Sequence, residues 1–129
     1  MKVLFVVPEI RLDNGPNHFP FWAGNLAAIA ENKGAEVAIL DLNALRDSFR
    51  GNVIPTDFVI DQLSLAKWDL VGIGGLTTTY GRIKQLVPMI RKTNPNSLIL
   101  AGGGWSTYNP QEILQLVPDI DIIAIGEGE

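Results

Sequence analysis

The chain of 129 residues contains no cysteine. Its own residues therefore cannot form a disulfide, a thiolate metal site or an iron–sulfur cluster. The absence of cysteine suits a cytoplasmic protein, which is the location we expect. No apolar run approaches the ~20 residues that a membrane-spanning helix needs, so we also expect no membrane span.

Positive charge is scarce as well. The chain has 10 lysines and arginines against 14 aspartates and glutamates, which gives a formal net charge of -4. The basic residues are scattered, and only Arg91 and Lys92 are adjacent. This balance argues against a nucleic acid or an anionic membrane surface as the partner. A composition of 47% hydrophobic and 19% charged residues is ordinary for one soluble domain with a full core.

Apolar runs alternate with segments of helical spacing along the whole chain. Apolar runs predict five strands, at residues 3–7, 35–42, 69–75, 97–103 and 120–126. Helical spacing predicts four helices between them, at residues 21–34, 54–68, 77–95 and 109–118. Pro88 should kink the third helix or shift its start. The alternation predicts an α/β, flavodoxin-like (Rossmann-like) three-layer sandwich with a five-stranded parallel sheet of order 2-1-3-4-5.

In such a sheet, ligands bind beyond the carboxyl ends of the strands, near the point where strand order reverses. The relevant loops follow the first, third and fourth strands, at residues 8–20, 74–81 and 102–110. The second and third of these loops are rich in glycine, and threonines dominate the second. Glycine in one such loop is explained equally well by tight turning, but two neighbouring glycine-rich loops favour a ligand site. Bare backbone with nearby hydroxyls suits a large flat molecule.

Several familiar ligands of this fold lack their motifs here. Residues 8–20 contain only Gly15, so the G-x-G-x-x-G turn of a dinucleotide site is missing. The glycines at 102–104 are followed by Trp105 and not by the lysine of an ATP P-loop. The third strand ends without the aspartate of a phosphoacceptor domain, and residues 8–20 lack the hydroxyl groups of a flavodoxin phosphate loop. These absences argue against a dinucleotide, a P-loop nucleotide, a phosphoacceptor site and a flavodoxin-type phosphate site.

Four segments, taken in order, carry a resemblance to a known family. They are NLAAIAENKGAEVAILDLN (25–43), WDLVGIGGLTTTY (68–80), PNSLILAGGGWSTYNPQEIL (95–114) and DIDIIAIGEGE (119–129). This set resembles the N-terminal cobalamin (B12)-binding domain of B12-dependent radical SAM proteins. That group includes the anaerobic magnesium-protoporphyrin IX monomethyl ester cyclases and many methyltransferases.

The resemblance implies that residues 1–129 form one cobalamin-binding domain, excised from the N-terminal part of a longer radical SAM enzyme. A catalytic domain outside this chain would hold S-adenosylmethionine and a 4Fe-4S cluster, and would perform methyl transfer, oxidative cyclisation or rearrangement. This chain itself would supply no catalytic residue. Two alternatives stay open, a cofactor-free scaffold or interaction domain and a stand-alone enzyme for another small ligand. The lack of catalytic acids and bases makes the last the weakest.

The resemblance also implies where the cofactor lies. The corrin ring would cover the carboxyl edge of the sheet, and the nucleotide tail would pass between the loops after the third and fourth strands. The implied cofactor-binding residues are Gly74, Gly75, Leu76, Thr77, Thr78, Thr79, Gly102, Gly103, Gly104, Trp105, Gly126 and Glu127.

Two features depart from the family pattern. The lower-ligand motif Asp-x-His-x-x-Gly is absent, because Asp13 and His18 are five apart and Phe21 stands in the place of the glycine. His18 is the chain's one histidine and so its one imidazole candidate for cobalt, although we favour an ordinary loop histidine. Trp22 replaces the glycine of a Pro-Pro-x-Gly motif, where it either blocks axial access from below or caps the core. We favour the core position for Trp22.

Overall fold

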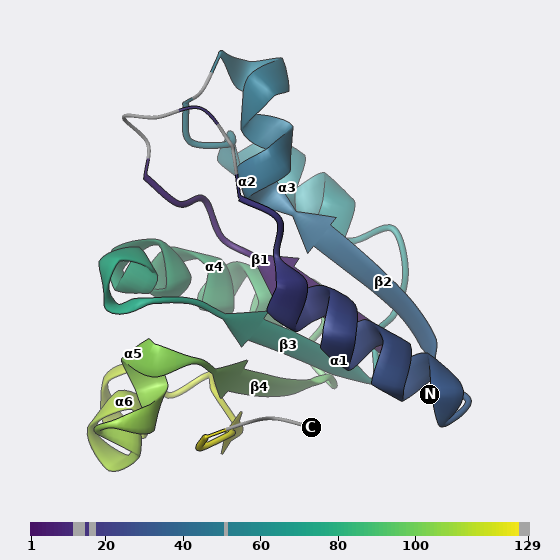
Figure 1. The fold of residues 1–129 in the computed structure, drawn as a ribbon, viewed down its shortest axis with the longest axis vertical. Helices are drawn as coiled ribbons and strands as arrows, with labels where there is room; N and C mark the ends of the chain where they lie inside the picture. The colour runs from purple at the N-terminus through teal and green to yellow at the C-terminus, as the bar shows by residue number, and fades with distance from the viewer. Residues whose placement is uncertain (12–14, 16–17, 51, 127–129) are drawn as a thin grey trace.

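The computed structural model describes residues 1–11, 15, 18–50 and 52–126. They form an all-parallel five-stranded sheet of order β2-β1-β3-β4-β5 (Figure 1). The strands are β1 (Lys2–Val7), β2 (Glu36–Asp41), β3 (Leu70–Gly74), β4 (Leu98–Gly102) and β5 (Ile122–Ile123). Both the fold class and the strand order agree with the prediction from apolar periodicity.

Six α-helices and two 3-10 segments connect these strands in the described residues. They are α1 (Phe21–Asn32), α2 (Leu42–Leu45), η1 (Arg46–Phe49), α3 (Thr56–Leu63), η2 (Thr77–Thr79), α4 (Tyr80–Thr93), α5 (Gly104–Thr107) and α6 (Pro110–Leu116). Four match the predicted helices, whereas α2, η1 and α5 have four residues each and are too short to show apolar periodicity. Within the described residues, none of the helices has the length and apolarity to cross a membrane.

The predicted third helix begins later than its sequence pattern suggests. The hydroxyl of Thr79 donates to the Leu76 carbonyl (2.8 Å) and accepts from the Leu76 backbone N–H (3.0 Å). This local pairing closes a 3-10 turn over Thr77–Thr79, so the α-helix starts at Tyr80. Helix α4 then continues through Pro88 to Thr93.

The two faces of the sheet bury different clusters. Val71 and Ile73 of β3 pack in the larger cluster, with apolar residues of α3 and α4. Val3, Phe5 and Val7 of β1 point to the opposite face because side chains alternate along a strand. There they pack against Ala23 and Ala27 of α1 and form a second, smaller cluster. The pocket described next lies on this α1 face.

Candidate functional site

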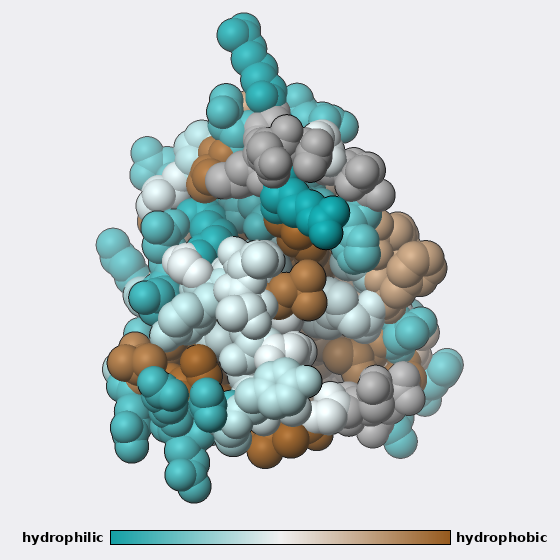
Figure 2. Space-filling view, turned by 60° about the vertical axis from the view of Figure 1, so that its left-hand side comes forward, coloured by the Kyte–Doolittle hydropathy of each residue, from teal (hydrophilic) through white to brown (hydrophobic). Residues whose placement is uncertain are grey.

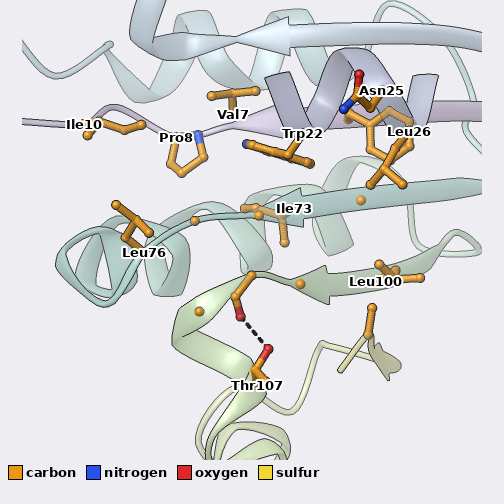
Figure 3. A pocket seen from close by; sticks show the side chains of 18 of the residues that line it. Val7, Pro8, Ile10, Trp22, Asn25, Leu26, Ile73, Leu76, Leu100 and Thr107 are labelled. Atoms are coloured by element: carbon orange, nitrogen blue, oxygen red, sulfur yellow. Dashed lines mark hydrogen bonds between the residues drawn. The ribbon is translucent and has the colours of Figure 1, made fainter. Parts of the chain in front are cut away.

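A pocket of about 730 Å³ opens at the carboxyl end of the sheet on the α1 face. The ends of β1, β3 and β4, the first turns of α1 and helix α5 line it (Figure 3). Figure 2, which brings the left-hand side of Figure 1 forward, shows pale and brown residues across the middle of the molecule, with hydrophilic side chains above them and along much of the margin. The volume lies within the ~300–1,000 Å³ typical of small-molecule sites.

Three glycines leave the floor of this pocket open. A Cβ atom added at Gly104 or Gly126 would meet no heavy atom within 4 Å. At Gly102 the nearest atom would be the Cβ of Ala124, at 3.8 Å, which is an ordinary contact. All three glycines line the pocket, and no protein atom lies closer than an ordinary contact to where their side chains would stand, so a ligand has room to approach their backbone.

The glycines of β3 have a different role, because the protein's own aromatic rings cover them. A Cβ at Gly72 would lie 2.7 Å from the ring of Phe5, and one at Gly74 would lie 3.0 Å from the indole of Trp22. Phe5 and Trp22 also pack edge to face, with ring centroids 6.2 Å apart and planes at 88°. These two glycines are needed for aromatic packing against the strand.

Gly103 lies where the two glycine-rich loops come into contact. Its φ of 93° and ψ of -179° fall in a region that essentially only glycine occupies. A Cβ there would lie 2.6 Å from the carbonyl oxygen of Gly75. The run of three glycines therefore has two causes, an open floor at Gly102 and Gly104 and contact between backbones at Gly103.

The structure places the residues implied by the resemblance in three groups. Those that line the pocket are Gly74, Gly75, Leu76, Gly102, Gly103, Gly104 and Gly126. Those that lie outside its lining are Thr77, Thr78, Thr79 and Trp105. Glu127 lies outside the described residues.

Two of the residues outside the lining, Thr79 and Trp105, support the loops in other ways. Thr77 and Thr78 are exposed, while Thr79 is buried and holds the 3-10 turn. The indole N–H of Trp105 donates to the carbonyl of Gly102 at 3.0 Å. The Trp105 ring packs on Tyr80, with centroids 5.5 Å apart, so it fixes α5 against the start of α4.

Several lining residues were not identified from the sequence. Asn25 and Leu26 reach the pocket from α1, Leu100 from β4 and Thr107 from α5. The Thr107 hydroxyl donates to the Gly103 carbonyl at 3.0 Å (Figure 3). Their spacing could have identified three of them. Asn25 and Leu26 lie one helical turn after Trp22, and Leu100 lies two residues before Gly102, so each shares a face of its helix or strand with a candidate residue.

A buried ion pair holds the loop after β1 beside the pocket. The carboxylate of Glu9 accepts from Nε and Nη2 of Arg82 at 2.8 and 2.9 Å, and from the Ile54 backbone N–H at 2.9 Å. Both charged side chains are largely buried, with 1% of Glu9 and 11% of Arg82 exposed. The pair fixes Glu9 between Pro8 and Ile10, which both line the pocket.

Asn43 and Arg46 fix the next residue of the same loop. The Asn43 side-chain oxygen accepts from the Ile10 backbone N–H at 2.9 Å. The buried Arg46 guanidinium donates to the Ile10 carbonyl and to Asn43 Oδ1. Both backbone groups of Ile10 are therefore paired, and this wall of the pocket is anchored to α2 and η1.

Replacing Arg82 with glutamine is expected to lower the free energy of unfolding by about 3 kcal/mol, because it leaves a buried carboxylate without its charge partner. Urea denaturation of the purified chain measures the loss. The matched control is Lys2→Gln, which breaks an exposed Lys2–Glu36 pair and should cost less than about 0.5 kcal/mol. Equal losses in the two variants would contradict the anchoring role of Arg82.

His18 lines the pocket and is exposed to solvent. In the described part of the chain, no group of three or more histidine, cysteine, aspartate or glutamate side chains is arranged to hold a metal ion. The described lining combines apolar side chains and bare backbone with a few polar side chains, among them the imidazole of His18. Asp13, the acidic residue of the incomplete lower-ligand motif, lies outside the described residues.

Solved structures support the fold independently. A response regulator protein from Burkholderia pseudomallei superposes with a TM-score of 0.64 at 17% identity, covering the whole of this chain and 62% of that one. At this identity the likeness shows the fold alone. In the present chain β3 ends in Gly74, so the position at which a phosphoacceptor domain carries its aspartate is a glycine.

Curated relatives match nearly the whole chain at low identity. The anaerobic magnesium-protoporphyrin IX monomethyl ester cyclase of Rubrivivax gelatinosus is 26% identical over 132 residues, which is 100% of this chain and 23% of the relative. The cytidylyl-2-hydroxyethylphosphonate methyltransferase of Streptomyces wedmorensis is 27% identical over 142 residues, which is 99% of this chain and 26% of the relative. The chain thus spans about a quarter of the length of these relatives.

The family match agrees with the site geometry and with the resemblance seen in the sequence. Residues 11–129 match the family described as the B12 binding domain. This match covers β2 to β5, the loops that carry the open glycines and most of the loop after β1. The chain therefore belongs to the B12-binding domain family.

Proposed function

We propose that this chain binds cobalamin with the nucleotide tail in the pocket on the α1 face and the corrin ring over the carboxyl ends of the strands. The open floor at Gly102, Gly104 and Gly126 carries this proposal. A large cofactor needs backbone that it can approach closely, and these three positions offer it beside an apolar wall. Cobalamin would supply the cobalt-centred chemistry, and the chain's own part is to hold and shield it.

The pocket residues offer the cofactor two kinds of contact. Leu26 and Leu100 present apolar surface to the inserted part of the ligand. Asn25, Thr107 and Tyr108 are among the polar side chains near it, and their amide and hydroxyl groups can pair with the amides and phosphate of a cobalamin. Thr79 holds the 3-10 turn, and the threonines at 77–79 do not line the pocket, so we assign them no contact with the cofactor.

We further propose that residues 1–129 are one domain of a longer cytoplasmic enzyme. Its catalytic domain would bind S-adenosylmethionine and a 4Fe-4S cluster in the manner of radical SAM enzymes. Two observations support this, the length of the relatives, which are about four times longer than the chain they match, and the absence of cysteine from this chain. The parent reaction would be methyl transfer, oxidative cyclisation or rearrangement.

A cofactor-free scaffold of the same fold is the second candidate. The observation that favours it is the coverage of Gly72 and Gly74 by Phe5 and Trp22, since the chain fills that part of the α1 face with its own rings. The open positions at Gly102 and Gly104 have no such coverage, which is why we prefer the cofactor-binding function.

Titration of the purified chain with hydroxocobalamin tests the proposal. We expect a saturable change in the visible spectrum at one equivalent and a raised melting temperature. A ligand at a hundred times its dissociation constant stabilises the folded state by about 2.7 kcal/mol. Unchanged spectra together with an unchanged melting temperature would contradict cofactor binding and favour the scaffold.

His18→Ala is expected to leave the visible spectrum of bound cobalamin unchanged. The side chain is exposed and the lower-ligand motif is incomplete, so we expect cobalt to have no imidazole from this chain. The measurement is the spectrum of the saturated complex of each protein. Loss of an imidazole-type spectrum in the variant would show instead that His18 is a ligand of cobalt.

A further inference from the structure

Trp22 lies in the first turn of α1, where its side chain joins the core to the pocket. Its side chain reaches from α1 toward β3 (Figure 3) and packs against Gly74. Phe5 of β1 braces it from the side through an edge-to-face contact. The indole is only half-buried and lines the pocket, so it belongs both to the smaller core cluster and to the ligand site.

The residues that face α1 divide the pocket floor into two strips. The β3 strip consists of Gly72 and Gly74, and the rings of Phe5 and Trp22 cover it. The β4 strip consists of Leu100 and Gly102. The carboxyl end of this strip is open, because a Cβ added at Gly102 would have only the Cβ of Ala124 within 4 Å, at 3.8 Å. A group that enters the pocket therefore lies over β4, with Trp22 as its lateral wall.

The shape and chemistry of this space favour a flat aromatic group. Trp22 presents indole surface on one side, Leu26 and Leu100 supply aliphatic contacts, and bare backbone at Gly102 forms the floor. Aromatic rings gain about 0.5–1.5 kcal/mol beyond area burial from offset or edge-to-face contact with another ring. A single planar base matches this lining of indole, aliphatic side chains and bare backbone.

We propose that Trp22 is a specificity-determining residue that selects ligands carrying a flat heteroaromatic base on their tail. This inference rests on the proposed cobalamin-binding function and deepens it. In this arrangement the indole contacts the base of the nucleotide tail and leaves the corrin ring untouched. The tail-dependent part of the affinity is therefore assigned largely to one side chain.

The test compares two ligands with three proteins. Hydroxocobalamin carries the nucleotide tail, and cobinamide has the same corrin ring without it. Trp22→Leu is expected to weaken hydroxocobalamin binding about tenfold, equivalent to 1.4 kcal/mol, and to leave cobinamide binding within about twofold. Trp22→Phe keeps an aromatic ring and should restore most of the loss. Circular dichroism and thermal melting check that each variant folds.

Each outcome of this comparison decides a separate point. Equal weakening of both ligands by Trp22→Leu, or no weakening of either, would overturn the role of Trp22 while cobalamin binding stands. Failure of the unmodified chain to bind either ligand would overturn the proposed function itself. Failure of Trp22→Phe to restore affinity would show that an aromatic ring is not what the tail requires.

A second measurement needs no folded Trp22 variant. The three tryptophans give three indole N–H signals in the ¹⁵N-labelled chain, and Trp68→Phe and Trp105→Phe identify the signal of Trp22 by elimination. Trp68 and Trp105 do not line the pocket. We expect hydroxocobalamin to shift the Trp22 signal more than cobinamide does. Equal shifts with the two ligands, or none, would overturn the inference.

Discussion

Replacing Gly103 with alanine is expected to lower the free energy of unfolding by about 3 kcal/mol, whether or not a ligand is present. The backbone there has φ 93° and ψ -179°, a conformation that costs a residue with a side chain about 1–3 kcal/mol. The new Cβ would also lie 2.6 Å from the carbonyl oxygen of Gly75. The atom it meets belongs to the backbone of the loop after β3 and not to a flexible side chain. The cost of this contact therefore adds to the cost of the backbone conformation.

Urea denaturation of Gly103→Ala and Gly104→Ala, side by side, measures this effect. Gly104 is the next residue and begins α5, and a Cβ there meets nothing within 4 Å. Alanine is also a better helix residue than glycine, so Gly104→Ala should keep or slightly raise stability. A stable Gly103→Ala variant would refute the contact between the two loops. A Gly103→Val variant would meet the same contact with Gly75, so a change in its cofactor affinity would reflect altered folding and would not test the binding site.

Replacing Gly102 with valine is expected to remove most cofactor affinity while the chain stays folded. Gly102 ends β4 with an ordinary strand conformation, and a Cβ there makes only a 3.8 Å contact with Ala124. Valine suits a strand, so its methyl groups would be accommodated by the protein but would fill the pocket floor. Overpacking of about 1–3 kcal/mol corresponds to a loss of about fivefold to 150-fold in affinity.

The measurement is the dissociation constant for hydroxocobalamin, with the melting temperature of each ligand-free protein recorded beside it. Gly102→Ala should give a smaller loss, because it adds one methyl group. The control is Gly81→Ala on α4, where a Cβ also meets nothing within 4 Å but the residue does not line the pocket. Full affinity in a stable Gly102→Val variant would exclude this floor as the binding surface.

The sheet could be predicted from the sequence because its signals are local. Apolar runs such as Val3–Val7, each followed by a helical pattern, define the alternation, and β/α alternation dictates parallel pairing. The order of the strands followed from the length and number of units. The short helices α2 and α5 were missed, because four residues are too few for a period to be seen.

The site was predicted less completely, because its geometry depends on residues far apart in sequence. The glycine-rich loops were identified correctly as neighbours, and seven of the twelve residues implied by the resemblance line the pocket. The reason for Gly103 was not visible, since Gly75 lies 28 positions earlier. The Glu9–Arg82 pair spans 73 positions, and nothing near either residue indicates it.

The sequence around Trp22 is compatible with two positions for its side chain, one in the core and one below the corrin ring. The sequence placed a large aromatic residue at the start of α1 and could not tell a core position from a position below the corrin ring. The structure shows that the indole contacts Phe5 and Gly74 and also lines the pocket. The core position that we favoured describes its packing, and its place relative to a corrin ring stays a prediction.

The most direct test of the account is a map of backbone amide shifts in the ¹⁵N-labelled chain during titration with hydroxocobalamin. If the cofactor lies over the open floor, the largest shifts belong to Gly102, Gly104 and Gly126 and to the first turns of α1. Large shifts confined to α3 and the distal turns of α4, on the opposite face, or no shifts at saturating ligand, would contradict it.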